Sequence, residues 1–224
     1  MICCPYCFCD LHHEETLLHY IYKDSALCGA CRKQLHRIMQ TACVQGLEIL
    51  MLYEYNEFFQ SMIFQYKEAR DIALKHVFFF DDIKRIQRRY KNYAIVLLPS
   101  SKEKMMERGF LPVKEMLKGC KLEMVEPFYK ASNHKQSLQS MEKRKEIKHV
   151  IKRNDDVALP KKPLLIIDDV CTSGSSLLHA YQLLQPHAYA IRAIVLSAHP
   201  YFLEQCQEHQ WMKNDLRHRE RVKL

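Results

Sequence analysis

One segment of the chain restricts its fold more than any other: Leu164–Leu178, with the sequence LLIIDDVCTSGSSLL. Its four leading apolar residues predict a strand buried on both faces, and Asp168 and Asp169 follow at the carboxyl end. The polar run Thr172–Ser176 then leads into an apolar stretch that predicts a helix. A buried strand, a small polar turn and a helix in this order are typical of an α/β fold with a parallel sheet.

The polar turn has the residue types of a phosphate-binding loop. Gly174 allows a tight backbone turn, and successive N–H groups, hydroxyls and a helix N-terminus can surround a phosphate. Asp168 and Asp169 lie one strand end away, where carboxylates can accept hydrogen bonds from vicinal ribose hydroxyls. The predicted phosphate-binding residues are Thr172, Ser173, Gly174, Ser175 and Ser176.

Two other interpretations of this segment are weaker. An apolar run that ends in Asp-Asp also resembles the Walker B strand of ATPases, but the chain contains no G-x-x-x-x-G-K-[ST] loop. Asp169 and Thr172 alone could serve as helix caps. Helix capping needs one such residue, however, and not a whole run of acidic, hydroxyl and small residues.

The remaining elements are predicted from hydrophobic patterns. Leu47–Tyr55 is compatible with a strand or a helix, whereas Glu57–Tyr66 has apolar residues at helical spacing and begins a helical span that reaches about Lys91. Short, continuous apolar runs separated by helix-length segments predict the other strands of a parallel sheet covered on both faces. These runs are Tyr93–Leu98, Leu122–Val125, Leu164–Ile167 and Ala188–Leu196.

The N-terminal segment carries a separate signal, two C-x2-C pairs with 20 residues between them. Each short turn can present two thiolates to one ion, so this spacing predicts a tetrahedral zinc site, with unliganded buried cysteines as the alternative. Gly29 lies where a knuckle can use a positive φ. The predicted zinc ligands are Cys4, Cys7, Cys28 and Cys31.

A closed site of four thiolates leaves no position for water, so we expect the zinc to be structural. The neighbouring Cys3, Cys9, His12 and His13 leave ligand exchange open. Cysteine and histidine are dense only at the N-terminus, and the length suits one ordinary domain with a small satellite. We therefore expect a zinc-binding module at residues 1–40 and an α/β domain at residues 41–224.

Composition bears on the compartment and on the partners. No apolar stretch approaches the roughly 18–20 residues needed to cross a bilayer, and the cysteine-rich start is not a basic, apolar leader, so we expect no membrane span and a cytoplasmic location. The net charge of +8 is concentrated in three clusters that are either solvated faces or contacts to a phosphate-rich partner. These clusters are Lys84–Lys91, Lys143–Arg153 and Arg217–Lys223.

Leu164–Leu178 resembles the signature of type I phosphoribosyltransferases that bind phosphoribosyl pyrophosphate. The resemblance implies that Asp168 and Asp169 hold the ribose hydroxyls, that Thr172–Ser176 binds the 5-phosphate, and that magnesium accompanies the pyrophosphate. It also implies the fold of that class, a parallel sheet with flanking helices.

Other motifs narrow this resemblance to the ComF family of late-competence proteins. A strand that ends in Pro99, Ser100, Ser101 and Lys102 and is followed by Glu107–Phe110 (ERGF) is similar to that family's pyrophosphate loop and helix start. Phe64–Lys67 (FQYK) and His134–Ser137 (HKQS) are similar to two further elements of the family. Two residues depart from the pattern, because Leu111 stands where many members have Asn, and no Thr follows near Asn133.

The family resemblance implies a late-competence protein that assists internalised single-stranded DNA during natural transformation, with a ComFA-type helicase or translocase as its partner. The basic clusters and four neighbouring aromatic residues are compatible with phosphate contact and base stacking, although these aromatics fit a hydrophobic core equally well. They are Tyr90, Tyr93, Phe128 and Tyr129.

The alternative is an active phosphoribosyltransferase with an unidentified acceptor. Lys102 or Arg108 would then assist the departing pyrophosphate, but the sequence identifies no catalytic residue and no base-selecting segment. A third interpretation is a scaffold that retains the loop as a relic.

Overall fold

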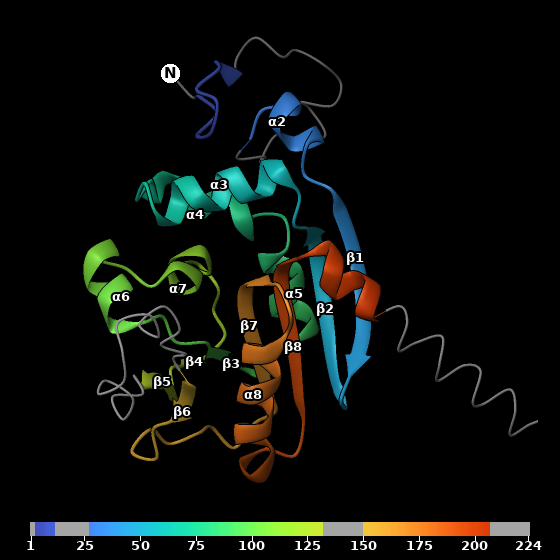
Figure 1. The fold of residues 1–224 in the computed structure, drawn as a ribbon, viewed down its shortest axis with the longest axis vertical. Helices are drawn as coiled ribbons and strands as arrows, with labels where there is room; N and C mark the ends of the chain where they lie inside the picture. The colour runs from blue at the N-terminus through green and yellow to red at the C-terminus, as the bar shows by residue number, and fades with distance from the viewer. Residues whose placement is uncertain (1–2, 12–26, 132–149, 207–224) are drawn as a thin grey trace, which may run out of the picture.

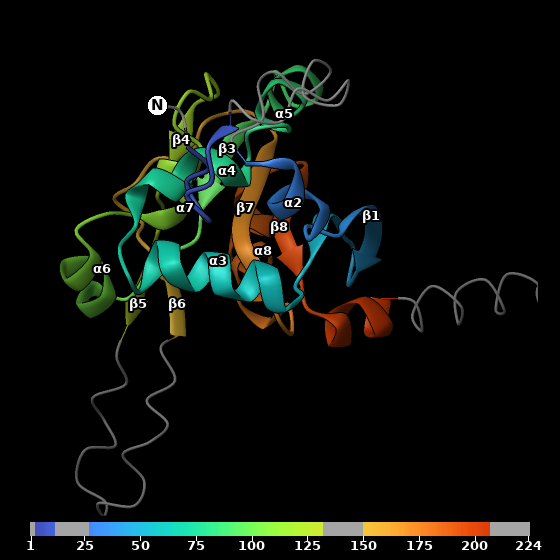
Figure 2. The same ribbon diagram turned by 90° about the horizontal axis from the view of Figure 1, so that it is seen from above.

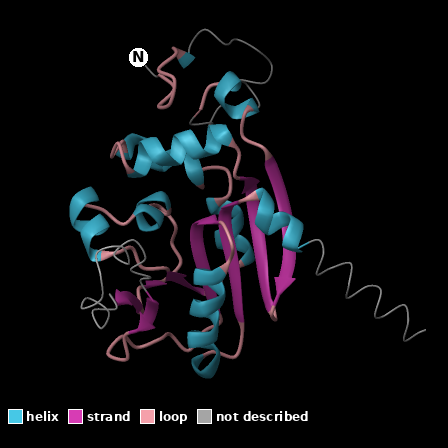
Figure 3. Cartoon of the chain, in the orientation of Figure 1, coloured by secondary structure: helices cyan, strands magenta, loops and turns pink. Residues whose placement is uncertain are grey.

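A computed structural model describes residues 3–11, 27–131 and 150–206 of the chain. The centre is a six-stranded sheet in the order β1-β2-β8-β7-β3-β4, in which β2, β8, β7, β3 and β4 run parallel and β1 pairs with β2 antiparallel (Figures 1 and 3). The strands are β1 Arg37–Val44, β2 Leu47–Glu54, β3 Ala94–Leu97, β4 Met124–Val125, β7 Leu164–Cys171 and β8 Ile191–Ala198. The predicted α/β class with a mostly parallel sheet is confirmed.

Helices cover both faces of this sheet, and a smaller sheet lies beside it. The smaller sheet pairs β5 (Phe128–Ala131) with β6 (Val150–Arg153) in antiparallel fashion. The described helices are α2 Gly29–Lys33, α3 Glu57–Lys67, α4 Lys75–Phe78, α5 Ile83–Arg89, α6 Lys102–Arg108, α7 Pro112–Met116 and α8 Ser175–Leu184, with 3₁₀ turns at Ile72–Leu74 and Gln185–His187.

The strand β7 shows why the sheet is buried on both sides. Because successive side chains point to opposite faces, Leu164 and Ile166 join one hydrophobic cluster while Leu165 and Ile167 join the other. The first cluster is covered by α8, and the second by α3, α4, α5 and α7, so that α5 and α8 lie on opposite faces of the sheet (Figure 2). Continuous apolar runs are therefore the pattern that this sheet requires.

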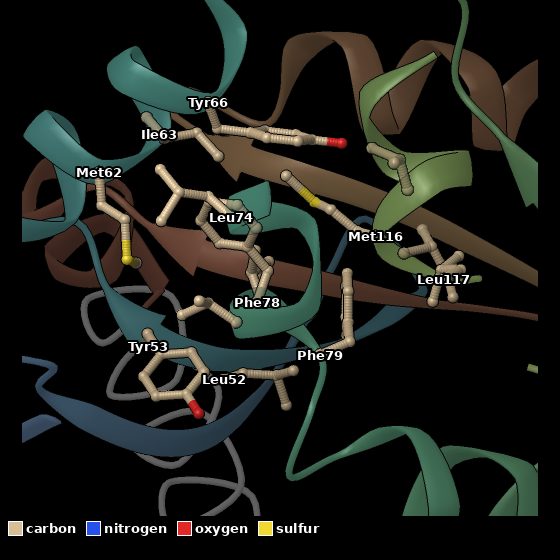
Figure 4. Packing of buried hydrophobic residues seen from close by; sticks show 14 of the residues in the cluster. Leu52, Tyr53, Met62, Ile63, Tyr66, Leu74, Phe78, Phe79, Met116 and Leu117 are labelled. Atoms are coloured by element: carbon tan, nitrogen blue, oxygen red, sulfur yellow. The ribbon is translucent and has the colours of Figure 1, made fainter. Parts of the chain in front are cut away.

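The cluster beneath α3 and α4 is rich in aromatic rings (Figure 4). Asn56 begins α3 by accepting a hydrogen bond from the backbone N–H of Phe59 at 2.8 Å. Near the other end of the helix, Tyr66 is fully buried and its hydroxyl donates to the carbonyl of Pro112 at 2.9 Å. Its ring lies 5.1 Å from that of Phe78 and 5.3 Å from that of Phe110, so Tyr66 ties α3 to α4 and α7.

The hydrophobic pattern did not predict β1 or the smaller sheet, and the single helical span that it predicted is interrupted. α3 ends before Arg70, which has a positive φ, and the chain continues as a 3₁₀ turn followed by the separate helices α4 and α5. β1 begins at Arg37, and a tight turn with positive φ at Gln45 and Gly46 connects it to β2. The proposed division into residues 1–40 and 41–224 stays a prediction.

We predict that Tyr66→Phe lowers the free energy of unfolding by about 1–2 kcal/mol, because the buried carbonyl of Pro112 loses its hydrogen-bond donor. Urea unfolding followed by circular dichroism measures the change. Tyr129→Phe, at a residue that is 43% exposed, is the control and should leave stability unaltered. Equal stability of the two variants would contradict the role given to Tyr66.

Candidate functional site

The predicted phosphate loop lies between β7 and α8, at the carboxyl edge of the sheet. β7 continues through Cys171, so Asp168 and Asp169 lie within the second half of the strand and not after its end. Gly174 has φ +74 and precedes α8, as a tight turn requires. The residues of the loop line a hollow of about 50 Å³ that also includes Asp168.

Close packing under the loop adds a second reason for glycine. A Cβ atom at residue 174 would lie 2.7 Å from Cε2 of Phe202, closer than side chains approach one another. Phe202 is buried beneath the loop, in residues 200–206, which are helical. Within the loop, the hydroxyls of Ser173 and Ser175 lie 2.8 Å apart. The loop therefore combines a fixed backbone with hydroxyls near its surface.

The two carboxylates differ in environment although they are adjacent. Asp169 is buried and forms an ion pair with Lys67 of α3, with 2.5 Å between Nζ and Oδ2. Asp168 is half-buried and accepts a hydrogen bond from the backbone N–H of Asp169 at 2.9 Å. The pKa of Asp168 is raised to about 7, mainly by burial and then by the charge of Asp169, while Lys67 and Lys130 oppose the shift.

A larger cavity of about 410 Å³ opens on the other side of the same carboxylates. Ser100 and Ser101 line it from the turn after β3, and Phe128, Tyr129 and Lys130 line it from β5. Since β3 and β7 are parallel neighbours, their carboxyl ends meet at one edge of the sheet. The predicted pyrophosphate turn and the predicted phosphate loop are thus brought to opposite sides of Asp168.

The residues of the turn after β3 have structural partners as well. Ser101 is buried and begins α6, where its Oγ accepts a hydrogen bond from the backbone N–H of Lys104 at 3.3 Å. Lys102 is the first residue of α6. Arg108, at the end of this helix, forms an ion pair with Glu68, the residue that follows α3, and this pair fixes its guanidinium beside the cavity. The Nε of Arg108 has no partner among the described residues.

Not every residue proposed for base stacking is accessible. Tyr90 and Phe128 are buried, which fits the core interpretation, whereas Tyr129 is 43% exposed. Lys67 belongs to the Phe64–Lys67 motif, and its pairing with Asp169 appears only in the structure. The sequence offers no signal for that pairing, because 101 residues separate the partners. His134–Ser137 and Asn133 lie outside the described residues.

The four predicted zinc ligands come together in space. The sulfur atoms of Cys4, Cys7, Cys28 and Cys31 all lie within 4.8 Å of one another, and those of Cys7 and Cys28 are 3.6 Å apart. A tetrahedral zinc ion with Zn–S bonds of about 2.3 Å places its sulfurs about 3.8 Å apart, so the cluster has dimensions suited to such an ion. It can hold a metal.

Backbone geometry sets the positions of these cysteines. In the first pair, the N–H of Phe8 donates to the carbonyl of Cys4 at 2.9 Å, and Phe8 has a φ of 60°. In the second pair, Cys28 caps α2, because its sulfur accepts from the N–H of Cys31. The positive φ expected at Gly29 is therefore found at Phe8 instead, since Gly29 begins α2.

Hydrogen bonding also favours the thiolate form of one ligand. The backbone N–H of Cys9 is the main cause that lowers the pKa of Cys7 to about 6. Cys3 and Cys9 are exposed, and a backbone bridge joins Cys3 to Asp10. The other two nearby residues considered for ligand exchange, His12 and His13, lie outside the described residues.

The described residues around the two cysteine pairs, which we call the cysteine segment, pack on α3 (Figure 2). The ring of Tyr6 lies 4.8 Å from that of Phe58, edge to face, and its hydroxyl donates to Ser61 at 3.0 Å. Arg32, next to Cys31, donates to Asp81 at 2.7 Å.

Among the residues that the structure describes, no helix is long and apolar enough to span a bilayer.

We predict that Cys28→Ser releases the bound metal and unfolds the cysteine segment, because three thiolates no longer close a tetrahedral site. Metal analysis of the purified variant measures the loss. Cys43→Ser removes an exposed thiol from β1 and should retain the metal. A wild-type protein that is metal-free with a folded N-terminus would exclude the site.

We predict that the free energy of unfolding of Asp168→Asn, relative to that of the wild type, is higher at about pH 8 than at about pH 5. The raised pKa of Asp168 means that the folded chain binds more protons than the unfolded chain between about pH 4 and pH 7. Ionisation therefore lowers the free energy of unfolding of the wild type as pH rises through this window, and the amide does not undergo this change. Urea unfolding at both pH values tests the sign, and a pH-independent difference would show that Asp168 titrates normally.

A scan against models of protein families finds no match. The chain is 25% identical over 194 residues to "Competence protein ComFC" of Streptococcus pneumoniae, an alignment that covers 76% of this chain and 86% of the relative. Among solved structures, a hypoxanthine phosphoribosyltransferase from Staphylococcus aureus matches with 17% identity and a TM-score of 0.34, over 53% of this chain and 59% of its own. APRTase from Giardia lamblia matches with 14% identity and a TM-score of 0.37, over 75% and 95%. The resemblance to the ComF family predicted from the motifs is confirmed, and the chain is ComFC-like in sequence over three quarters of its length.

Proposed function

We propose that the carboxyl edge of β3 and β7 binds phosphoribosyl pyrophosphate, or a related 5-phosphorylated ribose, together with magnesium. The observation that carries this proposal is the position of Asp168, which borders both the hollow of the phosphate loop and the larger cavity. A ligand with a phosphate at one end and a pyrophosphate at the other needs two anion sites with ribose-hydroxyl acceptors between them. The arrangement of loop, carboxylates and turn meets this need.

Different residues of the chain would bind the 5-phosphate, the ribose hydroxyls and the pyrophosphate. Thr172–Ser176 would surround the 5-phosphate with N–H groups and hydroxyls, and Asp168 and Asp169 would accept hydrogen bonds from the ribose hydroxyls. Ser100 and Ser101, which line the cavity, would receive the pyrophosphate together with the backbone of Lys102 at the start of α6. Magnesium, when bound, would neutralise charge on the pyrophosphate.

The cellular role that we propose is assistance to internalised single-stranded DNA during natural transformation, in cooperation with a ComFA-type translocase. The similarity to a relative named as a competence protein supports this role. Zinc at the four cysteines would be structural, because it would join two short segments that have little core of their own. A cytoplasmic location is part of the same proposal, since internalised DNA is found there.

A second candidate function is supported by the size of the larger cavity. Its volume of about 410 Å³ exceeds what a pyrophosphate needs, and its walls include the apolar Leu98, Val113 and Phe128. An apolar wall beside the ribose site suits an acceptor with a planar face. In an active phosphoribosyltransferase that acceptor would bond to the anomeric carbon of the ribose as the bond to pyrophosphate breaks. Release of pyrophosphate on addition of candidate acceptors would identify this activity.

We predict that wild-type protein binds phosphoribosyl pyrophosphate with magnesium in calorimetry, and that the double variant Asp168→Asn/Asp169→Asn binds it far more weakly. Each charge-assisted hydrogen bond that the variant cannot form should cost roughly 1.5–3 kcal/mol of binding free energy. The amides keep the size of the side chains, so the fold should survive. Absence of binding by the wild type would contradict the proposal.

A matched pair of glycine variants separates the loop from general strain. Gly174→Val should abolish binding, because its side chain would collide with Phe202 and displace the loop. Gly119→Val introduces the same residue at another positive φ, where no atom lies within 4 Å of the added Cβ, and should bind normally.

In a strain that lacks the gene, the double Asn variant should accumulate without restoring transformation. Full restoration would indicate a relic scaffold instead of a used site.

A further inference from the structure

We propose that a groove between the α4–α5 connection and the segment after α7 binds single-stranded nucleic acid, with Phe80 stacking on a base and Lys84 and Lys118 contacting phosphates. The groove has a volume of about 560 Å³ and shares no lining residue with the ribose–phosphate site. This proposal rests on the DNA-handling role proposed above and assigns that role to a surface. We call this surface the basic groove. Its aromatic and charged lining residues are His76, Phe80, Asp81, Lys84 and Lys118.

The residue types in the basic groove match the chemistry of a single strand. Phe80 is 41% exposed, so part of its ring is open to solvent beside the hollow. The side chains of Lys84 and Lys118 are exposed on two different walls, the first at the start of α5 and the second just after α7. An open aromatic ring between cations offers stacking and phosphate contact together, which is the combination that binds single strands without sequence preference.

The acidic residues at the start of α5 do not cancel this charge, because arginines from the N-terminal part of the chain neutralise them. Asp81, the carboxylate in the groove wall, is paired with Arg32 at 2.7 Å. The next residue, Asp82, is buried and is paired with Arg37 at 2.6 Å. Arg32 follows the metal-site residue Cys31, so the cysteine segment contributes directly to the electrostatics of the groove.

The cations along α5 and just after it form no ion pair among the described residues either, although the charge of Arg85 opposes the rise that burial causes in the pKa of Asp82. In the part of the chain that the structure describes, no carboxylate lies within ion-pair distance of any of them, and Arg89 instead lies over the ring of Tyr90. They therefore extend the positive surface beyond the groove, along the helix. These cations are Lys84, Arg85, Arg88, Arg89 and Lys91.

The ribose–phosphate cavity differs from the basic groove in this respect. Of the five cations that line that cavity, Lys67, Arg108 and Lys114 are each paired with a carboxylate, at Asp169, Glu68 and Glu126, whereas Lys104 and Lys130 form no ion pair among the described residues. Paired cations hold side chains in place, whereas uncompensated cations attract a polyanion and release its counterions on binding. The contrast assigns the small anionic ligand to the cavity and the nucleic-acid strand to the groove and α5.

Fluorescence anisotropy with labelled oligothymidylate tests the assignment. Phe80→Ala should weaken binding at least about 5-fold, since removing one base–aromatic stack costs about 1–3 kcal/mol. Tyr189→Ala removes a ring that is 81% exposed and lies outside the groove, and it should bind like the wild type. Equal weakening in both variants would overturn the role of Phe80.

Charge reversal provides a second, independent readout. Lys118→Glu should weaken binding and make the dependence on salt less steep, by about 0.7 in the log–log slope for each phosphate that is no longer neutralised. Lys161→Glu changes the net charge by the same amount at an exposed site before β7 and should keep the wild-type slope. Arg32→Gln leaves Asp81 unpaired beside the groove and should weaken binding while the protein retains its metal.

Controls separate failure of this inference from failure of the proposed function. Calorimetry with phosphoribosyl pyrophosphate should give wild-type affinity for all groove variants, which shows that they are folded. A wild-type protein that does not bind oligothymidylate at low salt would overturn both the groove and the proposed DNA role. Wild-type binding that persists in Phe80→Ala, Lys118→Glu and Arg32→Gln would overturn the groove alone.

Discussion

The parallel pairing of β7 with β3 on one side and β8 on the other is the constraint on which the site depends. Leu97 of β3 is the register partner of Ile167 of β7. This pairing brings the turn after β3 to the same edge of the sheet as the loop after β7. Two segments more than 60 residues apart in sequence thus border one carboxylate pair. The ion pair of Asp169 with Lys67 favours that alignment, because a slip by one residue would move Asp169 to the opposite face of the sheet.

Placing two carboxylates side by side in a partly buried site carries an energetic cost that the chain offsets in two ways. The ammonium group of Lys67 neutralises Asp169, while Asp168, with a pKa raised to about 7, is partly protonated near neutral pH. Residues kept in an unfavourable environment are characteristic of binding sites, where the ligand supplies the missing interactions. Lys67 itself is held by α3, which Tyr66 fastens to α7.

The N-terminal cysteine segment contacts the rest of the described chain through polar and aromatic side chains. Tyr6 packs on Phe58 of α3, and Arg32 binds Asp81 just before α5. Because the candidate ligand Cys31 and Arg32 are neighbours in the short helix α2, which Cys28 caps, an ion at the four sulfurs would fix the position of that arginine. The segment would then influence the charge of a surface that its cysteines do not touch.

The strands β3, β4, β7 and β8, the polar turn after β7 and the four clustered cysteines could be predicted from the sequence, because each depends on neighbouring residues: a run of apolar side chains, a glycine in a polar turn, a C-x2-C spacing. The segment of β2 was compatible with a strand or a helix, because a short apolar run does not distinguish the two. β1 was missed since an edge strand with one exposed face has no continuous apolar run, and its burial pattern is largely intermediate or exposed. β5 and β6 are short and belong to a hairpin whose partners are distant in the chain. The ion pairs of Lys67 with Asp169 and of Arg32 with Asp81 join residues that only folding brings together. The sequence by itself therefore determined which chemical groups the chain can present, whereas the tertiary structure decided which charges are neutralised and which stay available, because electrostatic interactions depend on distances in space and not on separation along the chain.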